Sequence, residues 1–201
     1  MYKESLFDDQ KTVSLKKGKV LTKPGDKIQK IYYLIKGNVK MYARTPNGDV
    51  TIHIFKKGSY FPTMLILGKL ANKYYFQAVS NVKVKVMTPE KVLKLLKNDP
   101  EVLLDLTRRL ALGIEGMSSR LVENLGERVD KKLISTLTYL GKSFGKELDG
   151  KTKINIPLTH NDLASWLGVS RETISREMKK LAKSGHIYYK YKEISLLNKV
   201  N

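Results

Sequence analysis

The sequence of 201 residues contains no cysteine. Disulfides, thiolate-bound iron–sulfur clusters and cysteine nucleophiles are therefore all excluded. The sequence also has no apolar run that approaches the length of about eighteen residues needed to span a bilayer. Its first ten residues, with Glu4, Asp8 and Asp9, do not resemble a secretory signal. These absences predict a cytoplasmic protein without a membrane partner.

Negative charge is also scarce. The chain has 38 Lys and Arg against 19 Asp and Glu, which gives a formal net charge of +19 and favours nucleic acid or an anionic surface as a partner. Only +4 of this charge lies in residues 158–201, and +15 lies upstream. Lysine outnumbers arginine 31 to 7, so a general lysine bias is the competing explanation. Charge alone does not locate a binding site.

Two short helices joined by a tight turn are predicted within residues 158–187. Thr159 is followed three residues later by an acid, a pairing that caps a helix start, and this helix should cover His160–Leu167. Gly168 can end it in a left-handed conformation. Ser170 can then cap a second helix, so the stretch predicts a helix-turn-helix.

The second helix, Arg171–Lys183, has one apolar face and one polar, basic face. Ile174, Met178 and Leu181 recur at spacings of four and three, which places them on the inward side. The side chains left facing outward are Arg171, Glu172, Ser175, Arg176 and Lys179. The first turn of a recognition helix usually meets base edges.

The outward side chains have the chemistry for reading base pairs. Arg can donate two parallel hydrogen bonds to O6 and N7 of a guanine, and Glu can accept from the amino group of a cytosine. Arg171, Glu172 and Arg176 could therefore read adjacent base pairs. Glu172 could equally serve only to favour the helix N-terminus, and exposed arginines are commonly solvated, so these residues alone leave base reading open.

The whole segment resembles the DNA-binding half of the CRP/FNR family of bacterial transcription regulators, whose recognition helix opens with Ser-Arg-Glu-Thr and carries an Arg one turn later. The matching residues are Ser170, Arg171, Glu172, Thr173 and Arg176. The resemblance implies base contacts by Arg171, Glu172 and Arg176, phosphate contacts by Ser170 and Thr173, and double-stranded DNA and RNA polymerase as partners. The family's oxygen sensors hold a cluster on cysteines, so this chain cannot be one of them.

Residues 13–87 predict an antiparallel barrel or roll of short strands. The β-rich stretches alternate with Gly, Pro and Asn turn signals and are Val20–Thr22, Lys30–Ile35, Val39–Ala43 and Val50–Phe55. The spacing resembles the cyclic-nucleotide-binding β-roll of the same family. The matching turn and core positions are Gly18, Gly25, Asp26, Tyr32, Ile35, Gly37, Val39 and Gly58. Another small β-barrel is the alternative.

The charged ligand-binding residues of that roll are missing. Family members that bind cyclic nucleotides carry a Gly-Glu pair for the ribose and an Arg-Ser pair for the cyclic phosphate. Here residues 58–59 are Gly-Ser and residues 72–74 are Asn-Lys-Tyr. No acid occurs in residues 50–89 and no Arg in residues 45–107. Without a carboxylate and a bidentate donor, cyclic AMP is not the expected effector.

The same stretch suggests an aromatic-lined cavity for an uncharged or aromatic effector. The candidate side chains are Tyr60, Phe61, Lys73, Tyr74 and Tyr75. Lys69 and Lys73 leave an anionic effector open, and haem is disfavoured because His53 is the only histidine of this region. Aromatic residues in such a segment are more often simply core, so the existence and identity of an effector are left open.

A long helix is predicted from about Pro100 to Gly126, capped by Asn98 or Asp99. Apolar residues recur every three or four positions along it, at Leu103, Leu106, Leu110, Ile114, Met117, Leu121 and Leu125. Such a stripe is longer than a β-roll needs, so we expect a two-helix seam between identical subunits. Packing within its own chain is the alternative. In the family that the chain resembles, this helix is the dimer axis.

The remaining segments complete a winged DNA-binding domain. The expected elements are a helix Glu127–Phe144, a loop Gly145–Thr152, a strand Lys153–Ile156, and a hairpin wing of Ile187–Tyr191 with Glu193–Leu197. His160, and Lys190 or Lys192 of the wing, could touch phosphates, which position a protein on DNA without specifying sequence.

The sequence thus predicts an α+β chain with three parts: an antiparallel, cupin-like β-roll in residues 1–97, a dimerisation helix in residues 98–127, and a winged helix-turn-helix in residues 128–201. We expect a homodimeric regulator that reads an inverted-repeat operator and has no cofactor. The alternative is an effector sensor that acts through protein–protein contacts. An enzyme or a metal site is not expected, because no metal-spaced His, Asp and Glu cluster, phosphate-binding Gly loop or nucleophile elbow occurs.

Overall fold

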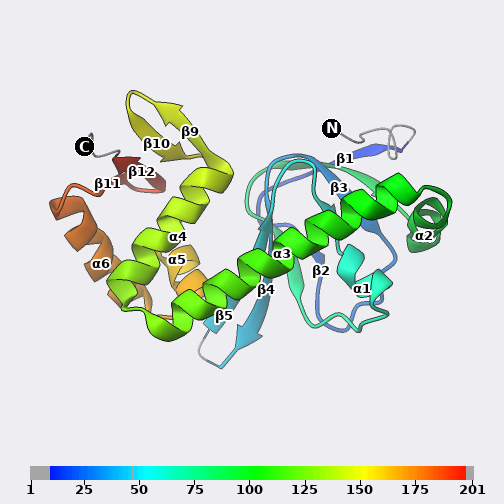
Figure 1. Ribbon diagram of the computed structural model, residues 1–201, viewed down its shortest axis with the longest axis horizontal. Helices are drawn as coiled ribbons and strands as arrows, with labels where there is room; N and C mark the ends of the chain where they lie inside the picture. The colour runs from blue at the N-terminus through cyan, green and yellow to red at the C-terminus, as the bar shows by residue number, and fades with distance from the viewer. Residues whose placement is uncertain (1–9, 47, 198–201) are drawn as a thin grey trace. The chain divides into compact units, whose positions relative to one another are not determined.

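The structure, a computed structural model, describes residues 10–46 and 48–197, with the backbone but not the side chains of residues 123–126. The chain divides into two compact units, whose elements are labelled in Figure 1. Unit 1 comprises Met1–Ala43 and Ile52–Ser119, and unit 2 comprises Arg44–Thr51 and Arg120–Asn201. Among the described residues, no helix combines the length and the apolar character that crossing a bilayer would require.

Two four-stranded sheets form the framework of the predicted antiparallel roll, which is confirmed. One sheet has the order β1-β8-β3-β6, made of β1 (Thr12–Leu15), β8 (Val82–Met87), β3 (Ile31–Lys36) and β6 (Tyr60–Phe61). The other has the order β2-β7-β4-β5, made of β2 (Val20–Thr22), β7 (Tyr75–Ala78), β4 (Val39–Thr45) and β5 (Gly48–Phe55). Neighbouring strands such as β3 and β8 pair antiparallel.

Aromatic side chains fill the interior of this roll. Phe61 and Phe76 are fully buried, and their ring centroids lie 6.0 Å apart. Phe55 stacks on Phe61 at 4.8 Å. Each such ring removes a large apolar area from water, so this cluster is a main source of the stability of unit 1.

The turns of unit 1 depend on the glycines that the family resemblance singled out. Gly18, Gly25, Gly37 and Gly58 all have positive φ angles between 83° and 87°, a region that other residues adopt only with strain. Gly37 is the most constrained, because a Cβ atom there would lie only 2.4 Å from the backbone oxygen of Asn81.

Two helices in unit 1 were not predicted, namely α1 (Thr63–Leu67) and α2 (Pro89–Asn98). The side chain of Thr88 caps α2 by accepting a hydrogen bond from the amide of Lys91. With the start of the next helix, α2 covers a second apolar cluster on β3 and β8, formed by Ile31, Tyr33, Met87, Val92, Leu96, Val102 and Leu106.

The long helix α3 has the predicted bounds, Pro100–Gly126. Asp99, one of the two predicted caps, accepts a hydrogen bond from the amide of Val102 at 3.2 Å. Leu106 is buried and Leu110 half-buried against unit 1 itself, so this part of the apolar row packs within its own chain. Other members of the row stay between 42% and 65% exposed, namely Leu103, Ile114, Met117 and Leu121. The side chain of Leu125 lies outside the described residues.

Unit 2 contains the predicted winged helix-turn-helix. Its helices are α4 (Val129–Phe144), α5 (His160–Leu167) and α6 (Arg171–Lys183). Its sheet has the order β11-β12-β10-β9, made of β11 (Ile187–Lys190), β12 (Glu193–Leu197), β10 (Lys151–Ile154) and β9 (Gly145–Leu148). The β11–β12 hairpin is the predicted wing.

The predicted loop at Gly145–Thr152 is wrong, because this segment contains β9 and the start of β10, paired antiparallel. The predicted strand Lys153–Ile156 is also displaced, since β10 runs from Lys151 to Ile154. An Asp-Gly turn joins the two strands, and both residues have positive φ angles, as a type I′ hairpin turn requires. All four residues of β9 are exposed, so the strand lacks the apolar alternation that would have revealed it.

Candidate nucleic-acid interface

The helix-turn-helix starts with the predicted cap on α5. The Thr159 hydroxyl accepts a hydrogen bond from the amide of Asp162 at 3.1 Å, and the Asp162 carboxylate accepts from the amide of Thr159 at 2.9 Å. This reciprocal pair satisfies two backbone donors at the helix start. Gly168 then ends α5 at φ 65° in the left-handed region, as predicted.

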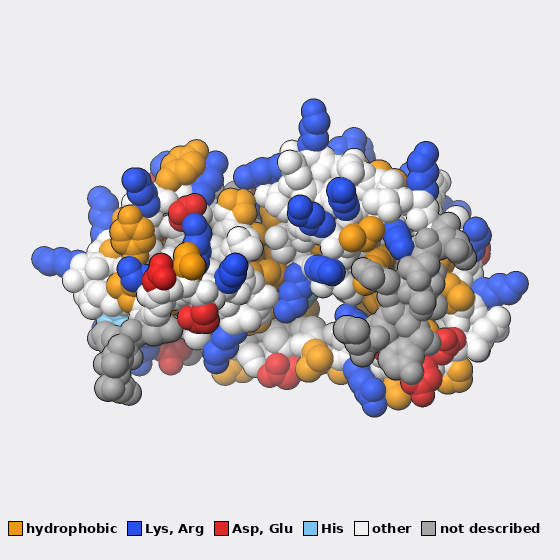
Figure 2. All heavy atoms as spheres, turned by 90° about the horizontal axis from the view of Figure 1, so that it is seen from above, with side chains coloured by type: hydrophobic (Ala, Val, Ile, Leu, Met, Phe, Trp, Pro, Cys, Tyr) orange, Lys and Arg blue, Asp and Glu red, His pale blue; other side chains and the backbone are white. Residues whose placement is uncertain are grey.

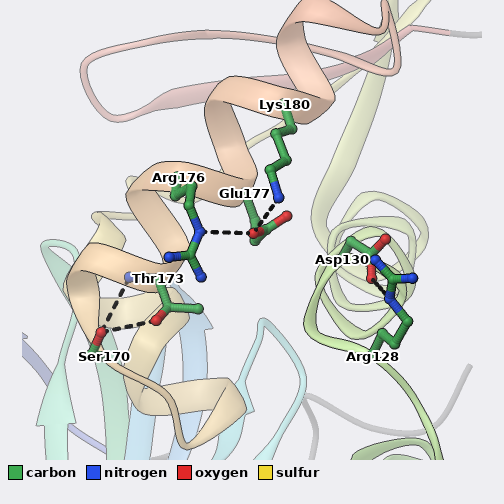
Figure 3. A network of polar contacts seen from close by, with 7 residues as sticks. All are labelled: Arg128, Asp130, Ser170, Thr173, Arg176, Glu177 and Lys180. Carbon is green, nitrogen blue, oxygen red and sulfur yellow. Dashed lines mark hydrogen bonds and ion pairs between the residues drawn. The ribbon is translucent and has the colours of Figure 1, made fainter.

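The second helix begins at Ser170, also as predicted. The Ser170 hydroxyl accepts a hydrogen bond from the amide of Thr173 at 3.1 Å, and the two hydroxyls lie 3.0 Å apart, as Figure 3 shows. Ser170 is exposed and Thr173 is half-buried. Both hydroxyls therefore lie at the N-terminal end of α6, where free backbone amides and the helix dipole favour an anion such as a phosphate.

One face of α6 is anchored in the core of unit 2. Ile174 and Met178 are fully buried and Leu181 is 9% exposed. Leu163 and Trp166 of α5 are buried as well, and the two helices pack directly on one another. The orientation of α6 about its own axis is therefore set by apolar packing, which fixes the side chains that face outward.

The outward face carries the residues that the sequence predicted. Arg171, Glu172, Arg176 and Lys179 are exposed and Ser175 is half-buried. An open groove of about 550 Å³ runs along this face, lined by Arg171, Glu172, Ser175, Arg176, Lys179 and Lys180. Five of the eight predicted DNA-contacting residues are thus brought together on one surface, and Ser170 and Thr173 lie at its N-terminal end.

The sequence analysis missed Glu177 and Lys180. The Glu177 carboxylate accepts hydrogen bonds from Lys180 Nζ at 2.9 Å and from Arg176 Nε at 3.2 Å, so the two cations converge on it (Figure 3). The bond from Lys180 lowers the pKa of the Glu177 carboxyl and outweighs the effect of burial, and the bond from Arg176 lowers it further. Two features of the sequence could have revealed the contact of Glu177 with Lys180. Lys180 is a cation three residues later on the same helix, and Glu177 lies between the apolar positions Ile174 and Leu181.

His160, the eighth predicted contact, lies at the start of α5 and is half-buried. Its ring centroid is 5.8 Å from that of Tyr189 in the wing. Burial lowers the pKa of the His160 imidazole, and the positive charges of Arg171 and Lys179 lower it further. The imidazole is therefore close enough to the basic face of α6 to sense its charge.

The predicted effector residues lie on different parts of unit 1. Phe61 belongs to the buried aromatic cluster, whereas Lys73 is exposed. Tyr60 lies against the ring of Tyr33 and under the guanidinium of Arg109, and burial, the largest cause, raises its pKa to about 12.

The other two tyrosines, Tyr74 and Tyr75, are half-buried near the start of β7. Tyr75 stacks on Tyr42 with ring centroids 5.0 Å apart. The neighbouring Asn72 is buried and donates hydrogen bonds to the Thr22 hydroxyl and the Lys23 carbonyl. Asn72 thus ties down the end of β2.

No group of three or more His, Cys, Asp and Glu residues within the described ranges could hold a metal ion. On the face drawn in Figure 2, Lys and Arg side chains are spread over both units and do not gather in one patch. The charge visible on this face therefore does not mark the interface, and the case for it depends on the geometry of α6.

In comparisons with known proteins, each of the two units matches a family model. Residues 12–99 match the family model of the cyclic nucleotide-binding domain, and residues 131–199 match that of the Crp-like helix-turn-helix domain. The chain is 28% identical over 193 residues to the transcriptional regulator SdrP of Thermus thermophilus, covering 94% of this chain and 91% of that protein. It is also 28% identical over 205 residues to the global nitrogen regulator of Synechocystis sp., covering 96% and 84%.

Solved structures show the same architecture. The crystal structure of TTHA1359, a transcriptional regulator of the CRP/FNR family from Thermus thermophilus, matches with a TM-score of 0.77 and 26% identity over 94% of each chain. The c-di-GMP responsive global regulator CLP of Xanthomonas campestris has the same fold, with a TM-score of 0.81, 19% identity and 97% of each chain covered.

Proposed function

Because the chain belongs to the CRP/FNR family of DNA-binding transcriptional regulators, we propose that two copies of it bind an inverted-repeat operator together. Each copy would insert α6 into the major groove of one half-site, and the two half-sites would lie about 34 Å apart along the duplex. A cytoplasmic location and the absence of a catalytic role are parts of this proposal.

The observation that carries the proposal is the outward face of α6, where the guanidinium groups of Arg171 and Arg176 and the carboxylate of Glu172 line one groove together with Ser175, Lys179 and Lys180. We assign base contacts to Arg171, Glu172 and Arg176, since guanidinium and carboxylate groups match the guanine and cytosine edges. We assign backbone contacts to the shorter or more peripheral polar residues, namely His160, Ser170, Thr173, Ser175 and Lys179.

The proposed dimer contact is the part of α3 that its own chain leaves uncovered. Leu103, Ile114, Met117 and Leu121 recur on one side of the helix and are 42% to 65% exposed, and a row of exposed apolar side chains often marks an interface. A second copy of α3 would cover it and would place two recognition helices in one complex. The division into residues 1–97, 98–127 and 128–201 is part of this proposal.

A selection of binding sites from random duplexes tests the DNA-reading role. The full-length protein should select an inverted repeat, and Arg171→Ala should lose preference at one base pair of each half-site, at a cost of about 1 to 3 kcal/mol. An Arg171→Ala protein that selects the unchanged consensus would refute the assignment of this residue.

A sensing role for unit 1 is our second proposal, favoured by its match to the cyclic nucleotide-binding domain. Because this chain lacks the charged contacts for a cyclic nucleotide, we propose a different small molecule, with Tyr60 and Phe61 of β6, and Lys73, Tyr74 and Tyr75 near the start of β7, as separate candidate contacts. Native mass spectrometry of the protein purified from its own host would reveal a retained effector. Binding to RNA polymerase is the remaining proposed partnership.

A further inference from the structure

We propose that Glu177 is a positioning residue, which holds the Arg176 guanidinium in the orientation that reads a base and thereby sets the base preference of α6. This inference rests on the DNA-reading role proposed above. Glu177 itself need not touch DNA, because its effect passes through the side chain that it holds.

The burial of Glu177 favours a lasting contact between its carboxylate and the side chains of Arg176 and Lys180. Its side chain is 8% exposed, whereas those of its partners Arg176 and Lys180 are 65% and 63% exposed. A carboxylate withdrawn from water is stable only if charged or hydrogen-bonding groups compensate for the lost solvation. The two cations provide this compensation, so leaving the contact would cost more here than at an exposed ion pair.

The atoms used in the contact leave Arg176 able to read a base. The bond to Glu177 is made by Nε at 3.2 Å, and an arginine has four further N–H groups on its two terminal nitrogens. Those groups form the planar fork that pairs with O6 and N7 of guanine. A guanidinium fixed at Nε has less conformational entropy to lose when DNA arrives, which favours the correct base.

The same oxygen, Glu177 Oε1, also accepts the bond from Lys180. The carboxylate therefore offsets positive charge that would otherwise attract any phosphate, whatever the sequence. Removing the charge of Glu177 should therefore have two effects. Discrimination at the base read by Arg176 should weaken, and binding to random DNA should stay equal or become stronger. A folding defect would instead weaken binding to both kinds of duplex.

The test compares Glu177→Gln with the wild type in the full-length dimer. Binding is measured by fluorescence anisotropy at one salt concentration, on the selected operator, on an operator changed at the base pair that Arg176→Ala relaxes, and on random duplex. We expect discrimination at that base pair to fall roughly threefold to tenfold, the range expected when one side chain loses its preordering. Binding to random duplex should not weaken.

Two matched variants complete the comparison. Glu193→Gln removes an equal charge from an ion pair of the wing, with Lys153 at 3.0 Å, and should leave base discrimination unchanged. Adding Glu177→Gln to Arg176→Ala should change discrimination no further than Arg176→Ala alone, because the group being positioned is gone. Additive losses in the double variant would overturn the proposal.

The hydrogen bond between Arg176 Nε and Glu177 can also be observed in the wild type, without any substitution that affects folding. In a nitrogen-15 NMR spectrum of the free protein, the Arg176 Nε–H should exchange with water more slowly than that of the exposed Arg171. Equal exchange rates would overturn the proposal, as would a Glu177→Gln protein that keeps wild-type base preference. A wild type that selects no sequence at all would instead refute the DNA-reading role itself.

Discussion

His160 shows how a single side chain can link DNA binding to pH. Its pKa is lowered by burial and by the nearby cations of α6, so the folded protein binds fewer protons at this imidazole than the unfolded chain does. The folded state therefore loses stability as the pH falls through the ordinary histidine value of 6.5. A phosphate placed beside the ring would have the opposite effect and raise the pKa.

We therefore expect operator affinity, measured by fluorescence anisotropy, to rise as the pH is lowered from about 8 to about 6. A rise of one unit in the His160 pKa on binding corresponds to about tenfold in affinity per subunit at the acidic limit. His160→Gln should flatten the profile, whereas His186→Gln should preserve it. An unchanged slope in His160→Gln would show that no phosphate approaches this ring.

The side chains that face outward on α6 were predictable, because a few buried apolar positions on a helix determine which face each of the other residues lies on. Arg171, Glu172 and Arg176 follow from the spacing of Ile174 and Met178. Glu177 did not follow, because a charged residue on the flank of an apolar stripe is normally assigned to solvent. Its burial became visible only with its two cationic partners in place.

At the scale of elements, the capping box of α5 supports the first helix of the reading motif. Thr159→Ala removes a hydroxyl that accepts from the amide of Asp162 and should lower the free energy of unfolding by about 0.5 to 2 kcal/mol. Urea titration followed by the fluorescence of Trp166, the only tryptophan of the chain, reports on α5 itself. Thr159→Ser keeps the hydroxyl and should stay near the wild type; an equal loss in both variants would mean that the hydroxyl is not the cause.

The exposed row on α3 gives a prediction about assembly. Ile114 is 65% exposed and lies within the row, so Ile114→Lys would bring a charge into the proposed seam and should convert the dimer to monomer at micromolar concentration. Leu112 is 72% exposed but lies about half a turn away from the row, so Leu112→Lys is the matched control and should remain dimeric. Sedimentation velocity distinguishes the outcomes; dimers of both variants would place the interface elsewhere.

Long periodic elements were the most predictable part of the fold. The bounds of α3, α5 and α6 agree with the prediction because caps and apolar period coincide there. The helix α2 was missed although Thr88 caps it and Val92 and Leu96 recur at helical spacing, whereas the helix α1 and the strand β9 were missed for a shared physical reason. Helix α1 is only five residues long, and all of β9 is exposed, so neither presents enough apolar repeats to reveal its period.

The whole molecule is basic mainly because of unit 1. Its described residues contain 20 Lys and Arg against 6 Asp and Glu, compared with 16 against 10 in those of unit 2. The unit that reads DNA is therefore the less positively charged of the two. Net charge predicted a polyanionic partner, but only the apolar spacing and the sequence motif of α6 indicated which residues are expected to contact it.

Salt dependence measures how many lysines meet phosphates in the complete dimer. Lys179→Gln should reduce the slope of log affinity against log salt by about two, one for each subunit, and should weaken binding to all sequences alike. Lys94→Gln on α2 removes the same charge from unit 1 and should leave the slope unchanged. Equal reductions in the two variants would show that unit 1 also contacts the duplex.

The partly exposed apolar row on α3 also predicts how promoter occupancy depends on the amount of this protein in the cell. A monomer carries one recognition helix, so full operator occupancy requires two chains to meet first. At cellular amounts below the dissociation constant of the dimer, occupancy rises with the square of the number of chains, and halving the expression of this protein would cut promoter occupancy about fourfold. Copy number would then act as a regulatory input alongside any small molecule.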